Sequence, residues 1–277
     1  NILAGEMPNG KKKKILLPIV PEYIGYADQG ITDNLFASCK PKIEFIDPHT
    51  FKYRIDFDKL HISADIAAIC VSRPTNPTGN VVTDDEINKL AKLAEKNQIP
   101  LIIDNAYGKP FPNAIFTESN LIWNKNIILS MSLSKLGLPT SRIGIFVADE
   151  KIVTALSRAN AILSLANAGF GQALVKPLLK DSKIIEISNN YIKPYYEDRL
   201  KQALGFIKKY FDDSLPYYVH KAEGTFFFWL WFKGMPITTK ELYNKLKKQN
   251  VIVVPGEYFF PGMQDKNWRH VHECIRI

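Results

Sequence analysis

Short apolar runs alternate with amphipathic stretches along the first half of the chain. The apolar runs of strand length are residues 15–20, 67–71, 99–103, 126–131 and 143–147. After Thr83-Asp-Asp-Glu86, which has the pattern of a helix capping box, Ile87, Leu90, Ala91 and Ala94 recur at helical spacing. Strands that alternate with helices and carry unbroken apolar residues predict an α/β fold, with a mainly parallel sheet buried between helices.

The second half of the chain has a different pattern. A helical region is predicted from about Leu163 to about Tyr210, with a break near Lys193-Pro194. Residues 225–231, 251–254 and 271–277 are strand-like, and residues 238–249 have helical spacing. We therefore predict a large domain over residues 1–190, followed by a connecting helix and a smaller α+β domain over residues 191–277.

Polar residues follow several of the predicted strands directly. They are Asn76, Asp104, Tyr107, Ser132 and Lys135. In open α/β sheets, ligands bind beyond the carboxyl ends of the strands. The sequence therefore predicts one crevice that these five side chains surround.

Charge and cysteine content narrow the function classes. The net charge is +8, but Lys and Arg are scattered, and the single run Lys11–Lys14 is interpreted as a solvated loop. We therefore expect no nucleic-acid binding.

The three cysteines are odd in number and widely spaced, so no disulfide framework is implied, which favours a reduced, cytoplasmic setting. Neither an apolar run of about 18 residues nor a signal-peptide pattern occurs, so no membrane association is expected.

One candidate metal site needs consideration. His270, His272 and Cys274 alternate along the predicted strand 271–277, so their side chains would face the same way and could bind zinc. No fourth ligand stands at a telling spacing, and Arg276 would share the same face. We expect no metal.

Three segments carry the most specific signal. Arg73-Pro-Thr-Asn-Pro-Thr-Gly79, Ile103-Asp-Asn-Ala-Tyr107 and Ser132-Leu-Ser-Lys-Leu-Gly-Leu-Pro-Thr-Ser-Arg142 resemble the core of the class I/II (fold-type-I) aminotransferases. The resemblance covers essentially the whole chain. It implies a fold-type-I large domain with part of a smaller C-terminal domain, and pyridoxal 5′-phosphate (PLP) as the cofactor.

The resemblance also implies roles for the residues around the ring of PLP. Lys135 would bind the aldehyde of PLP covalently and later move the substrate's α-proton, whereas Asp104 would pair with the pyridinium nitrogen. Tyr107 and Asn76 would donate hydrogen bonds to the 3′-oxygen, and Tyr23 would stack on the ring. The alternatives are a surface lysine, a capping or turn aspartate, turn residues at 76 and 107, and ordinary packing of Tyr23.

Further residues would hold the charged groups of cofactor and substrate. Ser132, Ser134 and Arg142 would bind the phosphate, since arginine binds phosphate bidentately. Arg276, together with Asn76, would bind the α-carboxylate of the substrate. A surface ion pair for Arg142 and a structural salt bridge for Arg276 are the alternatives. Arg142 follows Lys135 by seven residues, whereas many relatives have a spacing of eight.

A narrower likeness concerns the substrates. The likeness of residues 21–28, 71–80, 103–108, 131–139 and 230–233 implies an enzyme that exchanges the amino group of valine, or a similar small aliphatic amino acid, with pyruvate in a ping-pong cycle. It would act on amino acids and 2-oxo acids as a homodimer. Alternatives are a PLP-dependent β-lyase, another small-amino-acid aminotransferase, or a non-catalytic regulatory or binding protein of the same fold.

The ends of the sequence also lead to an expectation. The chain begins with Asn1 and ends inside a strand-like segment, so it is expected to be truncated at both ends. The amino-terminal arm and the phosphate-binding helix start of the resembled family are not found in it. Residues 1–277 alone are therefore expected to be inactive.

Overall fold

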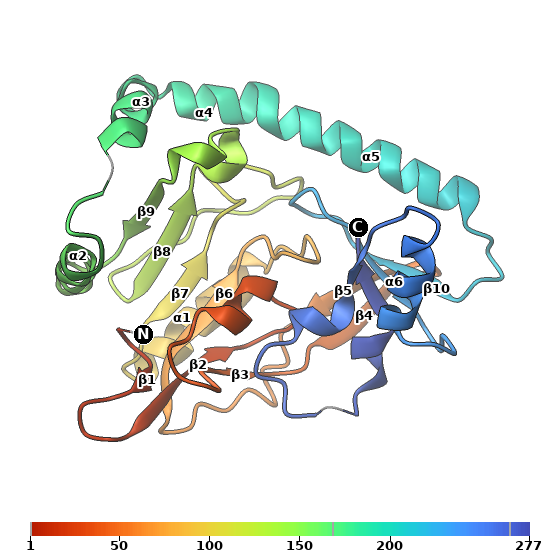
Figure 1. The fold of residues 1–277 in the computed structure, drawn as a ribbon, viewed down its shortest axis with the longest axis horizontal. Helices are drawn as coiled ribbons and strands as arrows, with labels where there is room; N and C mark the ends of the chain where they lie inside the picture. The colour runs from red at the N-terminus through yellow and green to blue at the C-terminus, as the bar shows by residue number, and fades with distance from the viewer. Residues whose placement is uncertain (1, 168, 266) are drawn as a thin grey trace.

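Two β-sheets organise the chain (Figure 1). The computed structural model describes residues 2–167, 169–265 and 267–277, so that Asn1, Ala168 and Lys266 lie outside the described part. Within this part the first sheet has seven strands in the order β1-β2-β6-β7-β8-β9, with β3 beside β2. These strands are β1 (Gly5–Glu6), β2 (Lys12–Leu17), β3 (Phe36–Ser38), β6 (Ile66–Ser72), β7 (Leu101–Asp104), β8 (Ile127–Ser132) and β9 (Gly144–Val147).

The first sheet is mainly parallel, as predicted. Strands β2, β3, β6, β7 and β8 run parallel, whereas β1 and β9 are antiparallel to their neighbours. Strand β9 is the predicted strand 143–147. It runs antiparallel to β8 because the connection over residues 133–143, which holds two 3-10 turns, is shorter than the crossover of a dozen or more residues that a parallel partner needs.

The centre of this sheet is the main core of the protein. Ile69, Leu101 and Ile127, from three neighbouring strands, have exposed fractions of 0%. Helix α1 (Asp84–Lys96) packs against β6 and β7. Its predicted capping box is present, since Thr83 accepts from the backbone of Glu86 and the Glu86 carboxylate accepts from Thr83 N. The apolar pattern therefore fixes both the sheet and the position of its first helix.

The connecting helices begin earlier than predicted. They are α2 (Glu150–Ser164), α3 (Gly169–Lys180), α4 (Lys183–Ile187), a π-helical turn over Ser188–Ile192 and α5 (Lys193–Tyr210). The predicted break near Lys193-Pro194 corresponds to this π-helical turn, after which α5 begins at Lys193. Pro194 lies in the first turn of α5, where its missing N–H costs no hydrogen bond. Helix α5 then runs along the top of the molecule towards the second sheet (Figure 1).

The second sheet combines distant segments. Within the described residues it has six strands in the order β12-β13-β11-β10-β5-β4. These are β4 (Lys42–Asp47), β5 (Thr50–Arg54), β10 (Tyr217–His220), β11 (Trp229–Phe232), β12 (Val254–Pro255) and β13 (Cys274–Arg276), with α6 (Thr239–Lys247) beside them. Two of them, β4 and β5, come from the N-terminal side of the boundary placed at residue 190, and that boundary stays a prediction.

Two local predictions are wrong. Lys12–Lys14 belong to β2 rather than to a loop; Lys13 donates to Ala64 O and Lys14 pairs with Asp65 at 3.5 Å at the exposed start of the strand. His270 and His272 lie in a 3-10 helix, Arg269–His272, and not in one strand with Cys274. His272 Nδ1 contacts Glu257 Oε2 at 2.8 Å, whereas the buried His270 ring contacts Tyr53, so the three side chains do not face one way.

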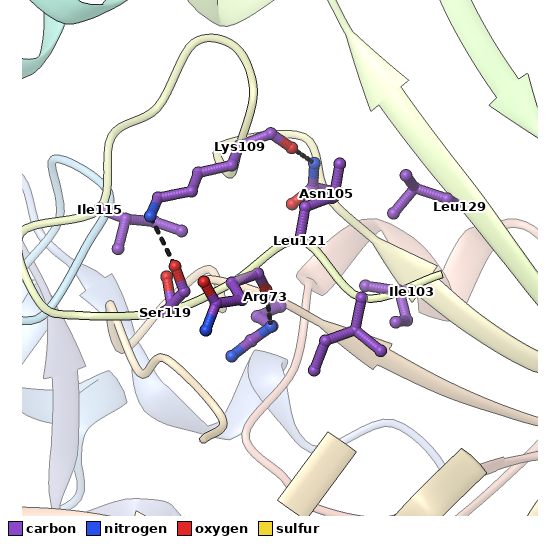
Figure 2. A pocket seen from close by; sticks show the side chains of 10 residues that line it. Arg73, Ile103, Asn105, Lys109, Ile115, Ser119, Leu121 and Leu129 are labelled. Carbon is purple, nitrogen blue, oxygen red and sulfur yellow. Dashed lines mark hydrogen bonds between the residues drawn. The ribbon is translucent and has the colours of Figure 1, made fainter. Parts of the chain in front are cut away.

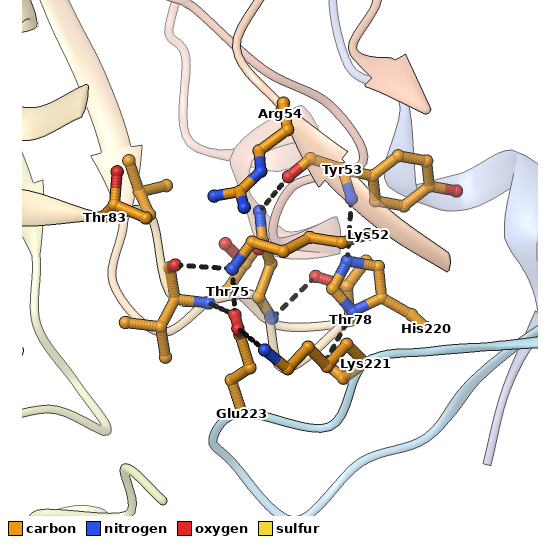
Figure 3. A network of polar contacts seen from close by, with 12 residues as sticks. Lys52, Tyr53, Arg54, Thr75, Thr78, Thr83, His220, Lys221 and Glu223 are labelled. Atoms are coloured by element: carbon orange, nitrogen blue, oxygen red, sulfur yellow. Dashed lines mark hydrogen bonds and ion pairs between the residues drawn. The ribbon is translucent and has the colours of Figure 1, made fainter. Parts of the chain in front are cut away.

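A buried ion pair joins the second sheet to the loop that precedes α1 (Figure 3). Lys52 of β5, which is 2% exposed, pairs with Glu223, which is 5% exposed. Lys52 Nζ also donates to Val81 O at 3.1 Å, and Val81 N donates to Glu223 Oε2 at 3.1 Å. The pair therefore fixes residues 73–82 against the second sheet. Separately, no helix among the described residues is long and apolar enough to span a membrane.

Candidate active site

One cavity of about 510 Å³ lies beyond the carboxyl ends of β6, β7 and β8. All nine residues proposed from the sequence line it. They are Tyr23, Asn76, Asp104, Tyr107, Ser132, Ser134, Lys135, Arg142 and Arg276. The structure thus brings together residues that are up to 253 positions apart.

Asp104 is the last residue of β7, and its carboxylate is held by three donors. Tyr26 Oη donates to Oδ2 at 3.0 Å, Ala106 N donates to Oδ1 at 3.2 Å, and Ser130 Oγ lies 3.4 Å from Oδ1. Burial raises the pKa of Asp104, while these hydrogen bonds favour its ionised form. A half-buried carboxylate of this kind, open to the cavity, suits a cationic ligand group.

A second set of contacts links the two sheets across the cavity. Arg276, the last residue of β13, donates from Nη1 to Asn76 Oδ1 at 3.0 Å. Its guanidinium carbon lies 4.5 Å from the centre of the Phe227 ring. Burial raises the pKa of Tyr107 to about 12, and a hydrogen bond with Asn76 opposes this rise. Asn76 therefore contacts both the cationic side and the phenolic side of the cavity.

Lys135 lies in a short 3-10 turn, Ser134–Leu136, directly after β8. Gly137 ends the turn with φ of 101°, a left-handed conformation that glycine adopts without strain. The Nζ atom lies 5.5 Å from the centre of the Tyr107 ring and 5.9 Å from that of Phe226. Within the described part of the chain it has neither a hydrogen bond nor an ion pair, so its amine is available to a ligand.

The other predicted residues form the rim of the cavity. Ser132 Oγ accepts from Ser134 N at 3.2 Å. Arg142 is exposed, has φ of 50° and donates to Pro139 O at 3.2 Å. Tyr23 is 37% exposed, and its ring meets that of Tyr26 edge to face at 5.6 Å. A hydroxyl group and a guanidinium near one exposed rim suit an anionic group.

Several residues at the site were missed. Ser72 and Phe227 line the cavity, and Tyr26 holds Asp104 from behind. Behind them, Glu22 is fully buried. Glu22 and Tyr26 lie close to Tyr23 in residues 21–28, a segment that the sequence analysis used. An acidic residue almost directly after the apolar run 15–20 is the signal that could have identified Glu22.

A second cavity, of only about 10 Å³, lies below the loop after β7 (Figure 2). That volume has room for about one water molecule, so it is not a ligand site. Beside it, Arg73 donates to Val82 O at 2.7 Å and to Asn120 O at 2.8 Å, and it pairs with Asp84 at the start of α1. Arg73 therefore anchors the loop that presents Asn76.

Comparisons with known proteins agree with this geometry. The family described as aminotransferase class I and II matches residues 42–277. The valine–pyruvate aminotransferase of Escherichia coli (strain K12) is 51% identical over 277 residues, which are 100% of this chain and 66% of that protein. The chain thus spans about two thirds of the length of this relative.

Solved structures give the same result. Valine–pyruvate aminotransferase AvtA from Salmonella typhimurium LT2 is 50% identical with a TM-score of 0.92, over 100% of this chain and 68% of that one. Kynurenine aminotransferase from Pyrococcus horikoshii shares the fold, with a TM-score of 0.76 at 19% identity, over 96% of this chain and 64% of that one. The predicted fold type is confirmed, and the chain belongs to the class I and II aminotransferase family.

Proposed function

We propose that the protein transfers the amino group between valine, or a similar small aliphatic amino acid, and pyruvate. The observation that carries this proposal is the single cavity in which an unpaired lysine, a half-buried aspartate and an arginine converge. The 51% identity to a valine–pyruvate aminotransferase supports the choice of substrates.

The residues present fit PLP, the cofactor of the family. A cationic ring nitrogen would face the half-buried carboxylate of Asp104, and Lys135 offers an amine for the aldehyde. Ser132, Ser134 and Arg142 would bind the phosphate at the rim. When bound, PLP supplies the electron sink that loss of an α-proton requires.

The chain's own residues would then divide the work. The amine of Lys135, which no described residue engages in a hydrogen bond, would take the proton from the substrate's α-carbon as general base. It would then donate this proton to the C4′ carbon of PLP as general acid. Asp104 holds the positive charge on the ring nitrogen through ion pairing. Asn76 and Tyr107 donate hydrogen bonds on the opposite side, and Arg276 orients the substrate by its carboxylate.

The polarity of the substrate side chain follows from the same cavity. Phe227 lines it beside Arg276, so the side chain of the substrate would meet an aromatic wall rather than a charge. This favours aliphatic amino acids over acidic or basic ones, and the choice of small ones rests on the likeness to the valine–pyruvate aminotransferase. A β-lyase or another small-amino-acid aminotransferase would use the same cofactor residues.

A substrate panel tests the proposal. The full-length protein with PLP is incubated with pyruvate and each of valine, isoleucine, aspartate, lysine and cystathionine, and 2-oxo acid and alanine are quantified. We expect alanine to form fastest with valine. Release of homocysteine and ammonia from cystathionine without alanine formation would establish the lyase instead, and a lack of turnover with all five would favour the non-catalytic alternative.

We also propose that the protein is a cytoplasmic homodimer. Large apolar side chains at the junction of α2 and α3 are 80–88% exposed, which suits contact with a second copy; they are Ile162, Leu163, Leu165 and Phe170. The cysteines Cys39, Cys70 and Cys274 are free, which fits a reducing compartment. Light scattering of the purified protein and fractionation of cells test the two statements.

A further inference from the structure

A second carboxyl group lies behind Asp104, in the interior of the protein. Glu22 has an exposed fraction of 0%. Its Oε1 atom accepts from Ser72 N at 2.8 Å, whereas Oε2 accepts from Tyr23 N at 3.2 Å and lies 2.7 Å from Ser72 Oγ. Glu22 has no cation within hydrogen-bonding or ion-pairing distance among the described residues. A buried carboxylate without a cation is costly, so its protonation state needs an explanation.

A continuous line of contacts joins Glu22 to Asp104. Glu22 Oε2 lies 2.7 Å from Ser72 Oγ, Ser72 Oγ lies 3.2 Å from Tyr26 Oη, and Tyr26 Oη lies 3.0 Å from Asp104 Oδ2. Ser72 and Tyr26 are 4% and 5% exposed. Solvent therefore has little access to the two hydroxyl groups, and the line meets the cavity at Ser72 and Asp104.

Counting protons along this line distinguishes two states. The three contacts need three protons, but Ser72 and Tyr26 carry one hydroxyl proton each. If both carboxyl groups are ionised, one contact lacks a proton and two oxygen atoms face each other unbridged. If Glu22 is protonated, Glu22 donates to Ser72, Ser72 donates to Tyr26, and Tyr26 donates to Asp104. In the second state every contact is a hydrogen bond.

The surroundings decide which carboxyl group holds the proton. Asp104 faces the cavity and accepts from Ala106 N as well as from Tyr26. The titratable groups that face Glu22 are Asp104, Tyr26 and Cys70, and none of them is a cation. Burial raises the pKa of Glu22 to about 8, and the charge of Asp104 adds to the rise. Two carboxyl groups linked through two buried hydroxyl groups do not both ionise easily when one of them is fully buried.

We propose that Glu22 is a neutral carboxylic acid which, through Ser72 and Tyr26, keeps Asp104 as the ionised partner of the ring nitrogen. Glu22 is thus a positioning residue that acts through two hydroxyl groups. The placement of the proton stands on the contacts alone, and its consequence for the ring nitrogen rests on the proposed function.

The proton is tested first, in the full-length protein without cofactor. The infrared spectrum at about pH 6 should contain the band of a buried protonated carboxyl group, and Glu22→Gln should remove it. Glu273→Gln is the matched control: Glu273 is also buried, but it pairs with Arg269 at 2.7 Å and accepts from Trp231 Nε1 at 2.9 Å. The spectrum of Glu273→Gln should lose a carboxylate band and keep the band of the protonated carboxyl group. Disappearance of a carboxylate band in Glu22→Gln would overturn the proposal.

The sign of the pH dependence gives a second measurement of the same proton. A folded-state pKa near 8, above the unfolded value of 4.5, means that the folded protein binds more protons between these values. Relative to Glu22→Gln, the unmodified protein should therefore lose stability as pH rises from 4.5 to 8. The slope of the unfolding free energy against pH should correspond to a difference of at most one bound proton. The opposite slope would overturn the proposal. Should Glu22→Gln fail to fold, the infrared band of the unmodified protein should titrate away near pH 8, and its absence throughout would count equally against the proposal.

The coupling to Asp104 is tested by PLP binding. Tyr26→Phe removes the donor that reaches Asp104, so it should raise the PLP dissociation constant by about 10-fold or more in the native background. In the Asp104→Asn background, which has no carboxylate to hold, the same change should have little effect. Equal losses in both backgrounds would show that Tyr26 acts only on packing. If the unmodified protein binds no PLP, the proposed function fails, while the infrared result still decides where the proton lies.

Discussion

Breaking the Lys52–Glu223 pair should destabilise the protein far more than breaking a surface pair. Lys52 and Glu223 are 2% and 5% exposed, and each also bonds the backbone of Val81. Glu223→Ala would leave the ammonium group of Lys52 buried without a counter-charge. Loss of one partner of a buried pair costs about 3–5 kcal/mol of folding free energy.

The measurement is urea unfolding, followed by circular dichroism and by fluorescence so that both sheets are reported. The control is Glu197→Ala, because Glu197 pairs with Lys201 four residues along the exposed surface of α5. Exposed pairs of this kind contribute about 0.3–0.5 kcal/mol. The difference between the two variants should therefore exceed about 2 kcal/mol.

A double variant separates charge from packing. In Lys52→Met with Glu223→Leu both charges are gone, and hydrophobic replacement of a buried pair is often nearly neutral. The double variant should therefore recover much of the loss, although Val81 N and O lose their side-chain partners. The reasoning is refuted if Glu223→Ala lowers the free energy of unfolding by no more than Glu197→Ala does. It is also refuted if the double variant loses more stability than Lys52→Met and Glu223→Leu lose together as single variants.

Four further predictions concern the site and the acid stability. Borohydride reduction of the PLP-loaded protein and peptide mapping should find the pyridoxyl group on Lys135; a label on another lysine would contradict the assignment. Asp104→Asn should keep the fold by circular dichroism but lower turnover on the order of 100-fold or more, and near-normal turnover would exclude charge pairing. Arg276→Lys should raise KM for both valine and pyruvate by about 10- to 100-fold, since arginine binds carboxylates bidentately; unchanged KM values would remove it from the site. Burial lowers the pKa of His220 and of His270 to about 3, below the unfolded value of 6.5, so the unfolded state binds more protons between these values. Stability should therefore fall as pH drops below about 6.5, and a flat urea midpoint from pH 6.5 to 4 would contradict this.

Much of the first sheet could be predicted because its signal is local. The central strands contain unbroken apolar residues such as Ile69 and Leu101, and the polar residues that follow them lie at one edge by the geometry of parallel strands. Lys135 stands out for the same reason, since a turn of small residues follows its strand directly.

The second sheet was harder to predict because its pairing is not local. Strand β5 pairs with β10, which joins Phe51 to His220, and no short-range pattern encodes that contact. The shared face expected for His270, His272 and Cys274 was wrong for a related reason: alternation predicts a shared face only if the backbone is extended, and at His270 and His272 it is helical. Glu22 was missed because its burial depends on Ser72, 50 residues away.

The side chain of Arg276, in the proposed substrate site, is already held in one conformation without substrate. The guanidinium of Arg276 lies between the rings of Phe227 and Phe259, at 4.5 and 5.2 Å, and is tied to Asn76. Immobilising a flexible side chain on binding typically costs about 0.5–1.5 kcal/mol in rotamer entropy. Here the rotamer entropy of Arg276 is lost on folding and not on binding. This matters for a ligand with only a few carbon atoms, because its few contacts could offset little of that entropy loss.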